Sequence, residues 1–466
     1  MNDIIYPTLD LFLYDLRNGL GESQDDINQN RAYFQKKLSE SVHPSLFQKD
    51  TYFEDEYVEL LSNPHFFETS NNPYPFQGYY YPVRLSDVYG LLLDCSVNNQ
   101  TEAQPAECFK ELKTEIEKRI NSQSATIGQT WMISGWIPQS EAKSPEDIAK
   151  TCYKALMPDS KWEQDLEGQG QFLGATIFEL SRYRLMMAEG TASLKTIQNI
   201  QENQHVIIIL YPDKAAAEKS ARFYSDWMRL FNYRHKILWA YGQSRLLKQT
   251  IKNYFAAIEE DRQFLNLNQS KEREFEKFRK TLIRVQDALN NYSVDLNRLE
   301  FQNLTIDINL SNYKKRLEQI EEKAGNKLEF LEQFTNLVTD KYQLQITKDS
   351  ENLERGMKLL ENTISAVRSR VEVEKAERDH NFQDAIAILG VGLSVASWSS
   401  DKLGDNPKDP VRVFLSHSPL PQHWIRPAVP LVYKISIALV AAALAWLLIR
   451  LWPELVKVIP LIPKKK

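Results

Sequence analysis

Cysteine is scarce in this 466-residue sequence, and the few cysteines do not form pairs. Cys95, Cys108 and Cys152 make neither a C-x-x-C motif nor an even-numbered framework. A disulfide-rich fold and a cysteine-ligated zinc site are therefore excluded. We expect three free thiols in a reducing compartment.

Catalytic and phosphate-binding motifs are missing as well. The sequence contains no G-x-S-x-G elbow, no Walker loop and no H-E-x-x-H motif, so we expect no enzyme activity and no cofactor. His417 and His423 lie six residues apart without a cysteine or carboxylate at ligand spacing, which does not indicate a metal site. Gly168, Gly170 and Gly174 miss the dinucleotide-binding spacing by one residue. A flexible loop is the default interpretation, and a phosphate cradle is the alternative.

Excess positive charge is also lacking. The chain has 57 Lys and Arg against 62 Asp and Glu, a net charge of −5, which does not favour direct binding of nucleic acid. No secretory signal precedes Pro7, so we expect the large N-terminal part to lie in the cytosol.

Residues 1–212 are predicted to form an α/β or α+β cytosolic sensor domain. Short apolar runs rich in β-branched and aromatic residues indicate strands, and helical patterns lie between them. This alternation favours a layered α/β arrangement. The strands are expected at 9–13, 79–81, 91–93, 131–136 and 205–210, and helices at 107–120 and 144–155.

Proline is absent from residue 213 to residue 406, and residues 213–380 are predicted to form a helical coiled-coil stalk. Asp213 is a suitable N-cap for a first long helix that ends near Phe264, and a turn follows at 266–270. A third helix from Leu353 is expected after a second reversal at 342–349. The second helix has an apolar seam at alternating steps of three and four, interrupted by polar Asn303. The seam consists of Phe275, Phe278, Leu282, Val285, Leu289, Tyr292, Leu296, Leu299, Ile306, Leu310, Tyr313, Leu317 and Ile320.

Two apolar runs near the C-terminus, 381–403 and 429–452, predict a transmembrane hairpin, because roughly 20 apolar residues cross a bilayer. The alternative is one anchor helix plus a buried or interfacial helix. Lys and Arg are frequent before the first run and in the basic tail, 453–466, so both termini are expected to be cytoplasmic. Residues 404–428 then form an external loop, and the protein would be a multi-pass protein of the cell (inner) membrane.

This organisation resembles the CorA family of membrane proteins, in which a cytosolic α/β domain precedes long stalk helices and two C-terminal membrane helices. The resemblance lies in the architecture and covers nearly the whole chain. The Gly-Met-Asn motif of the family's transporters is missing, and the first membrane run ends instead at Ser397-Trp398-Ser399-Ser400. The resemblance implies a homo-oligomer, a pentamer by family expectation. Similar CorA-like proteins serve as membrane effectors in prokaryotic antiviral nucleotide signalling.

A stripe of small and polar residues follows the first membrane run at steps of three or four. In a ring of subunits it would line a pore, and the alternative is close helix packing by small residues. The predicted pore-lining residues are Gln383, Ala387, Gly390, Ser394, Ser397 and Asp401, with His380 and Asp384 at the cytosolic mouth and Gly404, Asp405 and Asn406 at the external mouth.

The leading functional hypothesis is therefore an oligomeric membrane channel whose cytosolic domain binds a small molecule or a nucleotide messenger. The first alternative is a magnesium-type divalent cation transporter. The second is a membrane-anchored coiled-coil scaffold without conduction. The expected partners are further copies of the chain, the lipid bilayer and the small-molecule ligand.

Overall fold

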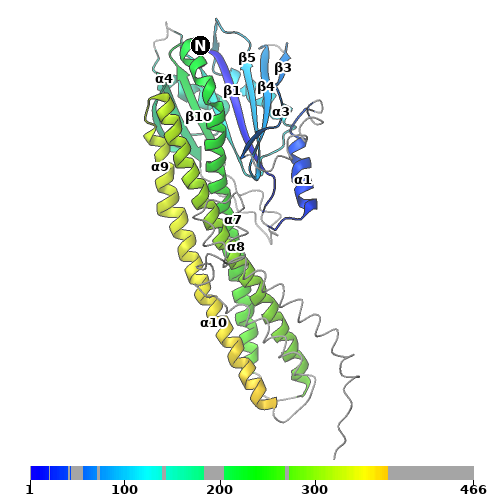
Figure 1. The fold of residues 1–466 in the computed structure, drawn as a ribbon. Coiled ribbons are helices and arrows are strands. Elements are labelled where there is room, and N and C mark those ends of the chain that lie inside the picture. Colours follow the sequence, from blue (N-terminus) through cyan, green and yellow to red (C-terminus); the bar gives the residue numbers. More distant parts are fainter. Residues whose placement is uncertain are drawn as a thin grey trace, which may run out of the picture. The chain divides into compact units, whose positions relative to one another are not determined.

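A large mixed sheet is the main feature of the part of the chain that the structure describes (Figure 1). The computed structural model describes residues 2–19, 21–39, 42, 56–70, 74–138, 143–182, 204–267 and 272–375. Ten strands within them follow the order β2-β4-β5-β1-β7-β10-β9-β8, with β3 paired to β4 and β6 paired to β1. The strands are β1 (Asn2–Leu16), β2 (Tyr57–Glu59), β3 (His65–Thr69), β4 (Phe76–Leu85), β5 (Val88–Val97), β6 (Ala103–Pro105), β7 (Gly128–Trp136), β8 (Leu166–Phe172), β9 (Ala175–Arg182) and β10 (Gln204–Tyr211).

Helices precede, interrupt and follow the strands. The predicted strands and the two predicted short helices are confirmed, within β1, β4, β5, β7 and β10 and at α3 and α4. The helical segments of the described residues are α1 (Gln24–Gln35), α3 (Cys108–Arg119), α4 (Pro145–Leu156), α5 (Trp162–Asp165), α6 (Lys214–Ser220), η2 (Ala221–Phe223), α7 (Tyr224–Leu267), α8 (Glu272–Ala324), α9 (Glu329–Leu337), η3 (Val338–Gln343) and α10 (Leu344–Lys375).

Strand β1 lies between β5 and β7 and is buried on both faces. Leu11 belongs to a hydrophobic core that includes residues of α3 and α4. Phe12, the next residue, packs edge-on against Phe231 of α7, and Tyr14 donates a hydrogen bond to the backbone oxygen of Met228 at 2.8 Å. Because successive side chains of a strand point to opposite faces, α3 and α4 cover one face of the sheet and α7 covers the other.

Local signals in the sequence set the helix starts. Ser144 accepts a hydrogen bond from the backbone nitrogen of Asp147, and Pro145 occupies the first turn of α4. Asp213 caps α6 by accepting from the backbone nitrogen of Ala216 at 2.8 Å, which confirms the predicted N-cap. The single long helix predicted from Asp213 is instead divided into α6, η2 and α7.

The reversal after α8 lies at Gly325, earlier than predicted. Gly325 has a φ of +69°, and Glu321 accepts hydrogen bonds from the backbone nitrogens of Gly325 and Asn326, which ends the helix. The predicted reversal at 342–349 is wrong, because these residues are helical in η3 and α10. The π-helical segment η3 shifts the phase of the helix. The apolar pattern of the sequence therefore fades there although the chain continues as a helix.

The glycine run after Asp165 is not a flexible loop, and this prediction was wrong. Gly168 and Gly170 lie in β8, and Gly174 forms the turn to β9 with a φ of +82°. A Cβ atom on Gly168 or Gly170 would lie 2.5 Å or 2.9 Å from side-chain atoms of Phe330. The two glycines therefore leave room for α9 on the sheet, which accounts for them without a phosphate.

The chain divides into two compact units. The first contains Met1–Leu246 and Leu299–Asp349, and the second contains Leu247–Arg298 and the described residues from Ser350 onward. In the second unit, the Tyr292 hydroxyl of α8 donates to the backbone oxygen of Leu353 in α10 at 2.6 Å. The predicted seam is confirmed as buried at Leu282, Val285, Leu289, Tyr292 and Leu296 here, and at Leu299, Ile306, Leu310, Tyr313, Leu317 and Ile320 in the first unit.

The fold class predicted from the sequence is nevertheless wrong. The described residues form one ten-stranded, mostly antiparallel sheet plus helices, in which only the β7–β10 pair is parallel among the pairings described. No helix among the described residues is long and apolar enough to cross a membrane. The predicted membrane runs, 381–403 and 429–452, lie outside the described residues.

Candidate functional site

None of the site residues predicted from the sequence lies in the described part of the chain. The proposed pore stripe, both proposed mouths and the external loop all follow Lys375, where the description ends. The candidate site instead lies in the first unit, on the face of the sheet that α7 covers.

A cavity of about 510 Å³ lies beside the N-terminal part of β1. Its walls come from β1, β3, β4, β5 and β7, from Tyr211 at the end of β10, from α6 and from Tyr224 at the start of α7. Small side chains form part of the floor, where the Thr8 and Ser96 hydroxyls lie 2.9 Å apart and Ser134 lies on the neighbouring strand.

Tyr6, at the edge of this cavity, has a strained backbone. Its φ is +50°, in the left-handed region that residues with side chains rarely adopt. The register between β1 and β7 shifts at this point, between Ile5 and Thr8, as in a β-bulge. The ring of Tyr6 stacks on Trp136 at 5.5 Å, and its hydroxyl accepts a hydrogen bond from Gln77 at 2.7 Å. Strain of this kind is concentrated at binding and catalytic sites.

Two carboxyl groups lie on neighbouring strands beside the cavity, and one of them lines it. Asp10 of β1 and Asp94 of β5 are directly opposite each other in the antiparallel pair, and Asp94 lines the cavity. Asp10 is fully buried, and its Oδ2 accepts a hydrogen bond from the Tyr224 hydroxyl at 2.9 Å. Its Oδ1 has no hydrogen-bond donor among the described residues. No described Lys or Arg forms an ion pair with either carboxyl group.

Burial governs how this carboxyl pair titrates. It raises the pKa of Asp94 to about 7, and it raises the pKa of Asp10 well above the ordinary value, with the nearby Asp94 charge adding to the effect. Ionising both carboxyl groups would place two like charges side by side away from water, which costs free energy. Near neutral pH the pair therefore shares a proton. The phenol pKa of Tyr224 is also raised by burial, so its hydroxyl stays a donor.

The rim of the cavity carries more negative than positive side chains. Glu68 lies on β3 and Glu218 lies on α6, while Lys214 is the one cationic residue among the described residues that line the cavity. The Lys214 ammonium donates to Gln100 Oε1 at 2.8 Å and lies 3.8 Å from a carboxylate oxygen of Glu218. The cavity as a whole is therefore acidic.

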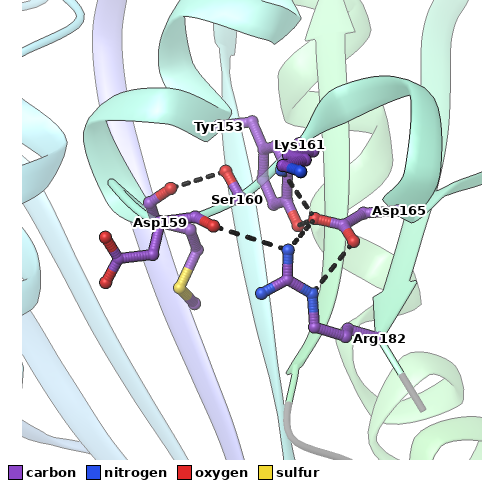
Figure 2. A network of polar contacts seen from close by, with 7 residues as sticks. Tyr153, Asp159, Ser160, Lys161, Asp165 and Arg182 are labelled. Carbon is purple, nitrogen blue, oxygen red and sulfur yellow. Dashed lines mark hydrogen bonds and ion pairs between the residues drawn. The ribbon is translucent and has the colours of Figure 1, made fainter. Parts of the chain in front are cut away.

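A second buried carboxylate, Asp165 in α5, lies elsewhere on the sheet and is fully paired. Figure 2 shows Tyr153, Lys161 and Arg182 around it. The Arg182 guanidinium donates to both carboxylate oxygens, at 3.1 Å and 3.2 Å, and the Tyr153 hydroxyl donates at 2.9 Å. The backbone nitrogen of Lys161 adds a further bond at 3.1 Å. This cluster joins α4, α5 and β9, and it leaves no acceptor for a ligand.

A third buried carboxylate, Glu179 of β9, also has a cation. The Arg234 guanidinium of α7 lies 3.0 Å from it and His205 Nε2 lies 3.2 Å from it. His205 Nδ1 and His235 Nε2 each lie 2.7 Å from the Thr130 hydroxyl. If Nε2 of His205 donates to the carboxylate, then Thr130 donates to Nδ1 and accepts from His235. Glu179 and its partners thus form a chain of paired groups between the sheet and α7.

The described residues contain no group of three or more His, Cys, Asp or Glu that could hold a metal ion. The three cysteines are buried free thiols, as predicted. Comparisons with protein-family models, with curated proteins and with solved structures find no match to this chain. The assignment of the site therefore depends on its geometry alone.

Sequence reasoning missed this site, although one signal for it was present. Asp10 stands between Leu9 and Leu11, and Asp94 stands between Leu93 and Cys95, so each carboxyl group interrupts an apolar strand. A charged residue inside a strand that is buried on both faces is costly unless it is paired or functional. Only the register of β1 on β5 brings the two together.

Proposed function

We propose that the sheet of the first unit is a small-molecule binding module, a sensor rather than an enzyme, whose ligand occupies the cavity above Asp10 and Asp94. The observation that carries the proposal is the carboxyl pair of buried Asp10 and partly buried Asp94. It has no cation among the described residues, yet it adjoins an open cavity. Desolvating two acidic groups in this way reduces stability, and such groups are typical of functional sites.

Two further features support a binding role. The cavity has the size of a site for a drug-sized molecule and combines aromatic walls with a few polar groups. Tyr6 keeps a strained backbone conformation at the edge of the cavity, and binding of a ligand can release this strain. The channel, transporter and scaffold functions predicted from the sequence depend on residues 376–466, and no described residue tests them.

The test is a thermal-shift screen of the full chain with fragments in equal numbers of anionic, neutral and cationic compounds. Ligands of the cavity should raise the melting temperature of the wild-type chain and of Thr151→Leu, an exposed change on α4 on the opposite face of the sheet. They should not raise that of Ser134→Leu, which places a side chain in the cavity. Hits that stabilise all three chains equally would contradict the proposal, and so would a screen without hits.

A further inference from the structure

The chemistry of the cavity limits its ligand. Phosphate and carboxylate ligands are generally met by Arg, Lys or a helix N-terminus. Here Lys214, the one described cation of the lining, is engaged by Gln100 and Glu218. Glu68 and Asp94 would repel an anion. The cavity therefore selects against anionic molecules, including the nucleotide messenger expected from the sequence.

The carboxyl pair has a hydrogen-bonding capacity that the described residues do not use. Asp10 and Asp94 point to the same face of the sheet from directly opposite positions. Tyr224 supplies one donor to Asp10 Oδ2, and Asp10 Oδ1 has no donor among the described residues. A positively charged nitrogen in the cavity would donate to Asp94, which lines it, and would supply the missing charge.

Aromatic rings surround the approach to the pair. Tyr6 and Trp136 stack on one side of the cavity, and the ring centroids of Phe66 and Tyr79 lie 5.8 Å apart on another. Phe66 is 70 % exposed, which is unusual for a phenylalanine and leaves its ring free to contact a bound molecule. Aromatic faces beside carboxylates are the usual environment for organic ammonium ions, which gain cation–π attraction from the rings.

Building on the proposed binding function, we infer that the ligand is an organic cation, a primary amine or a guanidinium, whose charged nitrogen binds at Asp94 on the wall of the cavity. The carboxyl proton leaves to solvent as the cation arrives, so charge is conserved and no other reactant is needed. The hydrocarbon part of the ligand then lies against the aromatic walls.

The exchange makes binding depend on pH. The other titratable groups that face the pair are phenols and the charged residues of the rim. Burial raises the pKa of the phenols, so they stay neutral between pH 6 and pH 8. These phenols and rim residues are Tyr79 on β4, Tyr211 on β10, Tyr224 on α7, Glu68 on β3 and Lys214 and Glu218 on α6. A group that must lose one proton near pH 7 gives about tenfold stronger binding at pH 8 than at pH 6.

The experiment compares 2-phenylethylamine, 2-phenylethanol and phenylacetate, which share a hydrocarbon and differ in charge. Dissociation constants for the full chain are measured by ligand-observed NMR at pH 6 and pH 8. We expect the amine to bind at least about tenfold more tightly than the alcohol at pH 8 and to weaken about tenfold at pH 6. Asp94→Asn should abolish this preference, whereas Asp87→Asn, an acidic residue paired with Lys236 away from the cavity, should keep it.

Each of the other outcomes rejects either the organic cation or the binding site itself. An alcohol or carboxylate that binds as tightly as the amine, and that Ser134→Leu displaces, would overturn the organic cation but keep the binding site. Failure of all three compounds, while anionic or neutral fragments bind in the cavity, would have the same meaning. If no fragment of any charge binds in the cavity, the proposed function fails as well. The comparison of charges uses the wild-type chain, so it does not depend on how the variants fold.

Discussion

Two of the buried carboxylate sites of the first unit differ in what neutralises them. Asp165 receives two bonds from Arg182, one from Tyr153 and one from a backbone nitrogen (Figure 2). Asp10 and Asp94 have each other and one phenol, and they adjoin an open cavity. The contacts of Asp165 hold α4, α5 and β9 together. Asp10 and Asp94 have no cation among the described residues, so a ligand can supply the positive charge. Burial of a carboxylate therefore indicates a binding site only together with the state of its partners.

The largest effect should follow from removing the cation of the paired site. Arg182→Met leaves Asp165 buried without a counter-charge, and we expect the free energy of unfolding to fall by about 3 kcal/mol. Urea denaturation of the full chain, followed by circular dichroism, measures the loss. Arg182→Lys is the matched control, because it keeps the charge and loses only the two-pronged geometry. A loss below about 1 kcal/mol for Arg182→Met would show that the site is not a structural ion pair.

The opposite behaviour is expected at the unpaired site. The pKa of Asp94 in the folded chain is raised to about 7, so the folded state holds a proton that the unfolded state releases near pH 4. The free energy of unfolding should therefore fall as pH rises from 4 to above 7, by a few kcal/mol. Asp94→Asn should remove the part of this fall that Asp94 contributes, while Asp10, whose pKa burial also raises, keeps its own part. The variant should be more stable than the wild type at pH 8.

Urea denaturation at pH 5, 6, 7 and 8 gives the difference between the two chains, which cancels the other titrating groups. The matched substitution is Asp165→Asn, which should destabilise the chain at each pH because it removes a satisfied acceptor from Arg182. If Asp94→Asn destabilises the chain equally from pH 5 to pH 8, the pKa of Asp94 is not raised in the folded chain, and the two sites would be alike.

The sequence predicted strands within β1, β4, β5, β7 and β10 because they are apolar and short, with turn residues around several of them. It missed β8 and β9, because the glycines of β8 favour a loop. It did not predict the short edge strands β2, β3 and β6, which have three to five residues and too little pattern to be distinguished from loops. The seam of α8 was predictable from its spacing of three and four residues. The phase shift of η3 hid the continuation into α10, and so the reversal was misplaced.

The candidate site was not predictable in the same way. Asp10 and Asp94 are 84 positions apart in the sequence, and only the pairing of β1 with β5 places them side by side. The cavity further requires the bulge at Tyr6 and the position of Tyr224, both of which depend on tertiary packing. The C-terminal apolar runs attracted the functional prediction because hydropathy is visible in a sequence, whereas cross-strand contacts are not.

The smallest expected effect tests whether Asp10 ionises. Tyr224→Phe removes the hydroxyl that donates to Asp10 and keeps the ring beside Phe12, 6.2 Å away. Losing this bond should cost about 1 kcal/mol at pH 5 and more at pH 8, because a hydrogen bond to a charged acceptor is stronger.

Tyr14→Phe is the matched control: its buried hydroxyl donates to a backbone oxygen, so its loss should be the same at both pH values. Equal, pH-independent losses in the two variants, measured by urea denaturation, would mean that Asp10 stays neutral up to pH 8. The negative charge that a cationic ligand meets would then be that of Asp94 alone.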